Sequence, residues 1–109
     1  MRICKRLQLG KKAAPYRDSI LWRMKKGKKQ KDLFVMTLAA NPKNLLELYP
    51  ADAVVQPYFL QSDLVVVGLA QGKTEADELI RSTIEQIYGE TGGLDVRAYF
   101  GETDEIGEG

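Results

Sequence analysis

Histidine is absent from this chain of 109 residues. Its absence excludes His-based general acid–base catalysis, Ser-His-Asp and Cys-His catalytic arrangements, and almost every type of zinc site. Any acid–base chemistry would have to come from Asp, Glu, Lys or Tyr, and the sequence holds no nucleophile or metal-ligand motif. We therefore expect a protein that is not an enzyme, with no cofactor and no bound metal.

Cysteine occurs once, as Cys4, so the chain cannot form an internal disulfide or a disulfide-stapled secreted scaffold. The basic amino terminus lacks the apolar segment of a signal peptide, because Lys11, Lys12 and Arg17 interrupt it. The longest apolar run, residues 64–70, is too short to cross a bilayer. These features predict a cytoplasmic protein without a transmembrane segment.

The composition, at 44% hydrophobic and 28% charged residues, is ordinary for a folded domain. A chain of this length has room for one hydrophobic core. We expect a single α+β domain over residues 16–100. A basic, flexible arm is expected at 1–15 and an acidic, disordered tail at 101–109.

Charge divides the chain into two parts. Residues 1–31 contain twelve of the sixteen Lys and Arg residues and one acid, Asp18, for a formal charge of +11. Residues 32–109 contain four bases and fourteen acids, for a formal charge of −10. A segment with this excess of one sign seeks a surface of the opposite sign, so the division is informative about partners.

The segment before the lysine run can be read in two ways. Apolar and polar residues alternate from Ile20 to Met24, as in a strand, while the spacing of four between Tyr16, Ile20 and Met24 also fits a helix. A glycine-bearing link at 25–31 separates this segment from a second apolar run at 33–38. We favour a β-hairpin whose tip carries five lysines.

The remaining segments predict two helices and three strands. The patterns favour a helix at 42–49, an edge strand at 54–60, a buried central strand at 64–70, a helix at 74–88 with Thr74 as its N-cap, and a half-buried strand at 94–100. The fold class is therefore α+β, a small antiparallel or mixed sheet with two helices. A ferredoxin-like βαββαβ order with an extra N-terminal strand is one arrangement that fits.

Gly72-Lys73-Thr74 follows the buried strand and opens a helix, which is the context of a phosphate-binding P-loop. The position at which that motif needs its first glycine holds Val67, and acids in the first helical turn would repel an anion. We interpret the segment as an ordinary strand-to-helix turn. Its acids are then partners of the helix dipole rather than metal ligands.

The basic segment is the strongest functional signal. Its lysines would repel one another unless a polyanion or an acidic surface lies nearby, and Tyr16 and Trp22 add rings that can stack on bases. Lysine-rich surfaces contact the phosphates of a nucleic acid and discriminate little between base sequences. We predict low-specificity nucleic-acid binding through the following residues: Arg17, Arg23, Lys25, Lys26, Lys28, Lys29 and Lys31.

Two alternatives stay open. In the first, the basic segment pairs with an acidic surface, in a protein-interaction or self-assembling domain such as a homo-oligomer. In the second, the lysines and Trp22 bind an anionic membrane surface, which a helical form of residues 16–26 would favour.

Overall fold

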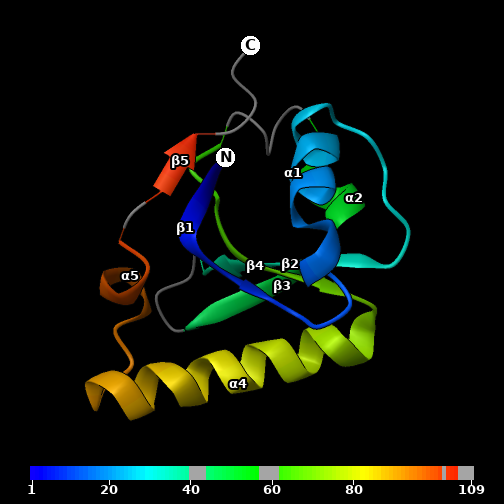
Figure 1. The fold of residues 1–109 in the computed structure, drawn as a ribbon. Coiled ribbons are helices and arrows are strands. Elements are labelled where there is room, and N and C mark those ends of the chain that lie inside the picture. Colours follow the sequence, from blue (N-terminus) through cyan, green and yellow to red (C-terminus); the bar gives the residue numbers. More distant parts are fainter. Residues whose placement is uncertain (40–43, 57–61, 102, 106–109) are drawn as a thin grey trace.

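Five strands form a mixed sheet with the order β3-β2-β4-β1-β5 in the computed structural model (Figure 1). The structure describes residues 1–39, 44–56, 62–101 and 103–105. The strands are β1 (Arg2–Leu9), β2 (Leu33–Leu38), β3 (Leu46–Pro50), β4 (Val65–Gln71) and β5 (Thr103–Glu105). Strand β1 runs parallel to β4, whereas β2 is antiparallel to β3 and β4, and β5 is antiparallel to β1.

Helices cover both faces of the sheet. They are α1 (Arg17–Lys25), preceded by the 3-10 turn η1 (Ala14–Tyr16), then α2 (Ala51–Val54), α4 (Lys73–Thr91) and α5 (Val96–Tyr99). Helices α1 and α2 lie on one side and α4 on the other (Figure 1). Ile20 and Met24 of α1 join one core cluster, while Leu79 and Ile87 of α4 join the second.

The α+β class with a mixed sheet is confirmed, and the two best-patterned segments fold as predicted. Strand β4 is central in the sheet and buried from residue 66 to residue 70. Helix α4 begins at Lys73 rather than after Thr74, because Gly72 is its N-cap residue. It ends where Gly92 adopts the left-handed conformation at φ 73°, which glycine takes without steric cost.

The prediction of a flexible arm at residues 1–15 is wrong. Residues 2–9 form β1, which lies between β4 and β5 in the sheet. Ile3 and Cys4 are both buried, one in each core cluster. The strand was hidden in the sequence because its pairing partner β4 follows some sixty residues later, with Arg2 opposite Val65.

The predicted lysine-tipped hairpin is also wrong, since residues 17–25 form α1. The spacing of four between Ile20 and Met24 places both side chains in the core, and they are 5% and 0% exposed. Gly27, which the hairpin prediction placed in the link at 25–31, lies just beyond the helix end with φ 70°. The lysines therefore lie at the end of α1 and in the connection to β2.

Three further segments differ from their predictions. In place of the helix at 42–49, residues 46–50 form β3, which pairs along β2; residues 40–43 lie outside the described part. Val54, predicted to start a strand at 54–60, ends α2, and residues 57–61 are also outside the described part. The strand expected at 94–100 is replaced by α5, whose N-cap Asp95 accepts a hydrogen bond from the Ala98 N–H.

The arrangement is not the ferredoxin-like one, because that fold has an antiparallel sheet with its helices on one face. Here β1 is parallel to β4 and helices lie on both faces. In the segment predicted as a disordered tail, residues 103–105 form β5 against β1, while residues 102 and 106–109 lie outside the described part.

Candidate functional site

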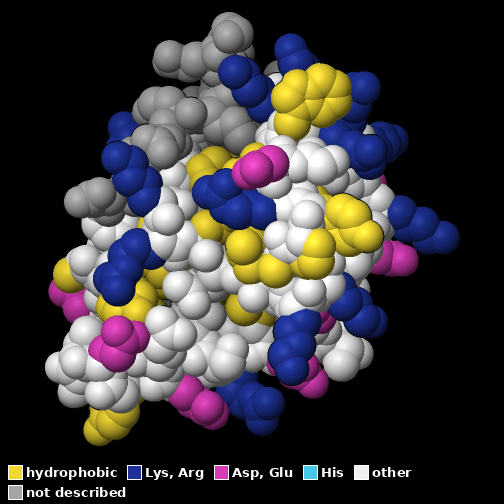
Figure 2. Space-filling model, in the orientation of Figure 1, with side chains coloured by type: hydrophobic (Ala, Val, Ile, Leu, Met, Phe, Trp, Pro, Cys, Tyr) yellow, Lys and Arg dark blue, Asp and Glu magenta, His cyan; other side chains and the backbone are white. Residues whose placement is uncertain are grey.

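One helix and the turn after it carry all seven residues predicted to bind a partner. The helix α1 supplies Arg17, Arg23 and Lys25, and the connection to β2 supplies the rest: Lys26, Lys28, Lys29 and Lys31. We call these seven residues, together with Trp22, the basic surface. In Figure 2, Lys and Arg side chains gather over the α1 part of the molecule.

The basic surface is open to solvent. Arg17 is partly buried, and the other six cationic residues are exposed. For Arg23 and Lys25 this exposure follows from the anchoring of α1, because Ile20 and Met24 turn toward the sheet and leave the opposite side of the helix outward. The other four lysines lie in the connection that follows α1.

The cations of the basic surface form few ion pairs with described acids of the same chain, although the Asp52 carboxylate lies at the turn and accepts the Gln30 N–H at 2.7 Å. Arg17 Nη1 lies 2.8 Å from Asp18 Oδ1, an exposed pair of neighbours along the chain. None of the other six cations forms an ion pair with an acid in the described ranges. Exposed lysines this close in sequence repel one another, so a surface with this arrangement binds anions favourably.

Trp22 lies within the lysines. Its side chain, the only tryptophan of the chain, is 52% exposed. The ammonium groups of Lys26 and Lys28 lie 6.0 and 5.1 Å from the centroid of its ring. The turn at Gly27 produces this arrangement, because the Lys28 N–H donates to the Arg23 carbonyl at 2.9 Å and brings the chain back along the helix.

Acidic residues concentrate on the other side of the sheet. Helix α4 exposes Asp77, Glu78 and Glu85, and Lys73 pairs with Asp77 across one helical turn. Part of the charge division of the sequence thus becomes a separation between the two faces of the fold, with the basic surface on the α1 side and these acids on α4 (Figure 1). The bases of β1 and the turn after it do not follow this separation, because Arg6 lies near Glu90 and the Lys12 N–H donates to Glu75.

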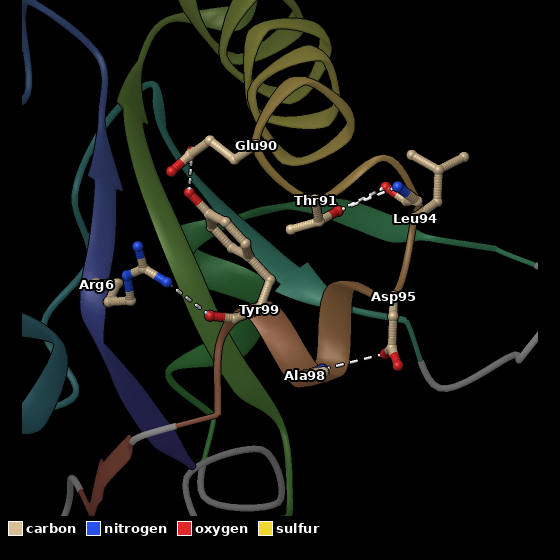
Figure 3. Close-up of a pocket in the computed structure, with 8 residues that line it drawn as sticks. Arg6, Glu90, Thr91, Leu94, Asp95, Ala98 and Tyr99 are labelled. Atoms are coloured by element: carbon tan, nitrogen blue, oxygen red, sulfur yellow. Dashed lines mark hydrogen bonds between the residues drawn. The ribbon is translucent and has the colours of Figure 1, made fainter.

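Apart from the basic surface, a pocket lies between the end of α4, α5 and β1 (Figure 3). It has a volume of about 540 Å³. The Arg6 guanidinium lies 4.4 Å from the centroid of the Tyr99 ring, and Arg6 Nη1 donates to the Tyr99 carbonyl at 3.2 Å. The Tyr99 hydroxyl donates to Glu90 Oε2 at 2.6 Å and accepts from Gln86 Nε2 at 2.7 Å.

Irregular pairing in β1 positions Arg6 in this pocket. Ile3 pairs with Val66 and Gln8 with Gly68, so β1 contains more residues than β4 over the same length. The hydrogen bond from Tyr99 lowers the pKa of Glu90 below its ordinary value, and Gln86 and Arg6 act in the same direction against partial desolvation. The groups here satisfy one another, which indicates a structural role.

Sequence reasoning missed this pocket because its members are far apart in the chain. Arg6 and Tyr99 are separated by 93 residues. Neither lies in a motif, and the segment around Tyr99 was predicted as a strand. The pairing of β1 with β4 and β5 brings Arg6 close to the carboxyl-terminal part of the chain.

The turn at Gly72-Lys73-Thr74 is not built to hold a phosphate. The carboxylate of Glu75 accepts the backbone N–H groups of Gln71 at 2.6 Å and Lys12 at 2.7 Å. The Lys73 ammonium pairs with Asp77 instead of pointing into a loop. An anion at this helix start would meet the Glu75 carboxylate, so the structure agrees with the reading of an ordinary turn.

The described residues contain no group of three or more His, Cys, Asp or Glu side chains placed to hold a metal ion. Over the same ranges, no helix has the length and apolar character needed to span a bilayer. In comparisons with known proteins, no family model, no curated protein and no solved structure matched the chain.

Proposed function

We propose that this protein is a non-enzymatic domain that binds nucleic acid with low sequence specificity through the basic surface. The observation that carries the proposal is the presence of six exposed cations on α1 and its following turn, unpaired with any described acid of the chain. In this proposal the protein acts in the cytoplasm, the compartment expected for a chain with one thiol.

Phosphate contacts explain both the affinity and the low specificity of such a surface. Each lysine that neutralises a phosphate releases condensed counterions, which favours binding whatever the base sequence. Five of the seven cations are lysines, which act as point charges and lack the fixed fork of arginine. A flexible ammonium at a helix end discriminates poorly between base edges.

Membrane binding is less well supported, although α1 is the helical form that it required. Insertion into a bilayer interface needs a free apolar helix face. Ile20 and Met24 are buried against the sheet, and Leu21 is partly buried, so the apolar residues of α1 are used in folding. Within α1 Trp22 remains as a large exposed apolar group, and Tyr16, the N-cap residue, is exposed just before it, which leaves no continuous apolar face.

Self-association is a second candidate, favoured by the charge separation between α1 and α4. The acids of α4 lie on the opposite face and do not reach the basic surface of their own chain. A second copy could bring its α4 acids to that surface. Sedimentation at several protein concentrations separates the two candidates, because a stable oligomer without affinity for nucleic acid supports self-association.

Binding to a labelled duplex and a labelled single strand, measured by fluorescence anisotropy at low and physiological salt, tests the proposal. We expect affinity that falls steeply between the two conditions. The variant K28Q/K29Q should bind several-fold more weakly than the wild type. The variant K73Q/R81Q, which removes the same charge from α4, should bind as the wild type does.

Two results would contradict the proposal. One is the absence of salt-dependent binding near physiological ionic strength. The other is an equal loss of affinity in K28Q/K29Q and K73Q/R81Q, which would mean that net charge rather than the basic surface governs binding.

A further inference from the structure

The exposure of Trp22 calls for an explanation that phosphate binding does not supply. Ile20 and Met24, two positions before and after it on α1, pack on the sheet, yet the ring of Trp22 is 52% exposed. Neutralising the phosphates of a nucleic acid requires only cations, and an exposed indole does not contribute to it. Tyr16, at the start of the same helix, is 65% exposed.

The two lysines beside the ring are held there by the backbone. Lys26 is the C-cap residue of α1 and its N–H donates to the Trp22 carbonyl at 3.1 Å. Lys28 returns to the ring through the left-handed conformation of Gly27. An indole beside two lysines whose backbone positions are fixed presents one stacking surface and two phosphate ligands together.

The strengths of cation–π contacts and of base stacking can be compared for an unpaired base that approaches the Trp22 ring. A cation–π contact at an exposed site is worth about a two- to fivefold change in an equilibrium constant. Stacking of a nucleic-acid base on an aromatic side chain is worth about five- to 150-fold. The two contacts on Trp22 are together worth about four- to 25-fold, so a base that stacks with the upper part of its range displaces the ammonium groups from the ring. The released lysines then bind the phosphates on either side of that base.

We propose that Trp22 is a stacking platform for an unpaired base, so that the ligand of the basic surface is single-stranded nucleic acid. The inference rests on the proposed function and names its substrate class. In a duplex the faces of the bases are stacked on one another, so the ring of Trp22 has no free base to contact. A duplex then gains only the phosphate contacts of the lysines.

The single tryptophan of the chain is its own probe. Its emission, excited where tyrosine does not absorb, reports on Trp22 alone. We expect oligodeoxythymidine to quench this emission on titration into the full chain, because the stacked base contacts the indole. A blunt duplex with the same number of phosphates should bind more weakly and leave the emission nearly unchanged.

Substitution of Trp22 separates stacking from charge. The variant W22A should lose about five- to 150-fold in affinity for labelled oligodeoxythymidine and keep its affinity for the duplex. The variant W22F, which keeps a smaller ring, should lose less. Tyr88 is exposed to a similar extent on α4, so Y88A is the matched control and should bind both ligands as the wild type does.

The outcomes distinguish this inference from the proposed function. If W22A weakens single-strand and duplex binding equally, or neither, the stacking platform is wrong while nucleic-acid binding stands. If the wild type binds neither ligand, both proposals fail. Since Trp22 is largely outside the core, circular dichroism and thermal melting should show W22A and W22F folded as the wild type, and W22F carries the test should W22A unfold.

Discussion

The Lys28 ammonium lies 5.1 Å from the centroid of the Trp22 ring, although the two residues are six positions apart in the chain. A helix continued beyond Lys25 would carry Lys28 away from this ring, because residues six apart do not share a helix face. The chain instead leaves α1 at Gly27 and turns back. The contact therefore shows that the end of α1 places Lys28 beside Trp22 within the basic surface.

The substitution G27A should disturb this helix end. An alanine at φ 70° costs about 1–2 kcal/mol of stability, because its Cβ crowds the following carbonyl. We expect a lower Tm and a change in Trp22 emission as Lys28 moves from the ring.

Gly89 provides the control for that substitution. It lies within α4, and a Cβ added there meets nothing within 4 Å. The variant G89A should therefore gain about 0.5–1 kcal/mol from higher helix propensity. Equal effects of G27A and G89A on Tm would contradict the assignment of Gly27 as the helix-terminating residue.

The Glu75 carboxylate should link the loop before α1 to the turn before α4. It accepts the Lys12 and Gln71 N–H groups, so E75A should cost about 1–3 kcal/mol in the free energy of unfolding. A Cβ on Gly10 would overlap the Glu75 side chain, so G10A should displace the same carboxylate.

A double-mutant cycle in urea checks this prediction. The two substitutions act on one carboxylate, so G10A/E75A should cost much less than the sum of the single variants. The neighbouring acid Glu78 is exposed, and E78A should change stability by no more than about 0.5 kcal/mol. Additive costs for G10A and E75A would contradict the shared anchor.

The pKa of Glu90 should depend on the Tyr99 hydroxyl. That hydrogen bond is the main reason that the pKa is lowered in the folded chain, so Y99F should raise it toward the ordinary value. Since the folded pKa is the lower one, the contribution to stability is present above the unfolded pKa and is lost as pH falls through the folded pKa. Carboxyl chemical shifts of Glu90 followed through an acid titration measure it in both proteins, and an unchanged pKa in Y99F would contradict the account.

In the segments that sequence analysis predicted correctly, the pattern of apolar residues fits only one type of secondary structure. Residues 64–70 are β-forming and apolar on both faces, and the buried stripe of α4 continues from Ala76 to Ile87, about three turns. The segment of α1 is short, and its apolar residues fit two periodicities at once. Packing of Ile20 and Met24 on the sheet decides between them, and that packing is a tertiary effect.

The pairing of distant strands could not be read from local pattern. Strand β1 is rich in bases and looks like an arm until β4 and β5 are placed on its two sides. Strand β3 holds leucines that also fit a helix, and the ladder with β2 fixes its form. For the basic surface, the cations could be identified from the sequence. The contact between Lys28 and Trp22 could not, because it depends on the turn after α1, which was predicted as the tip of a hairpin.

The salt dependence of single-strand binding, compared between the wild type and K25Q/K26Q/K28Q/K29Q, tests the central claim most directly. If these four lysines neutralise phosphates, the slope of log affinity against log salt should become shallower by about 0.7 for each lysine removed, or roughly 3 in all. The variant K73Q/R81Q should keep the wild-type slope. An unchanged slope in the fourfold variant would contradict the account, because the phosphates would then be bound elsewhere on the molecule.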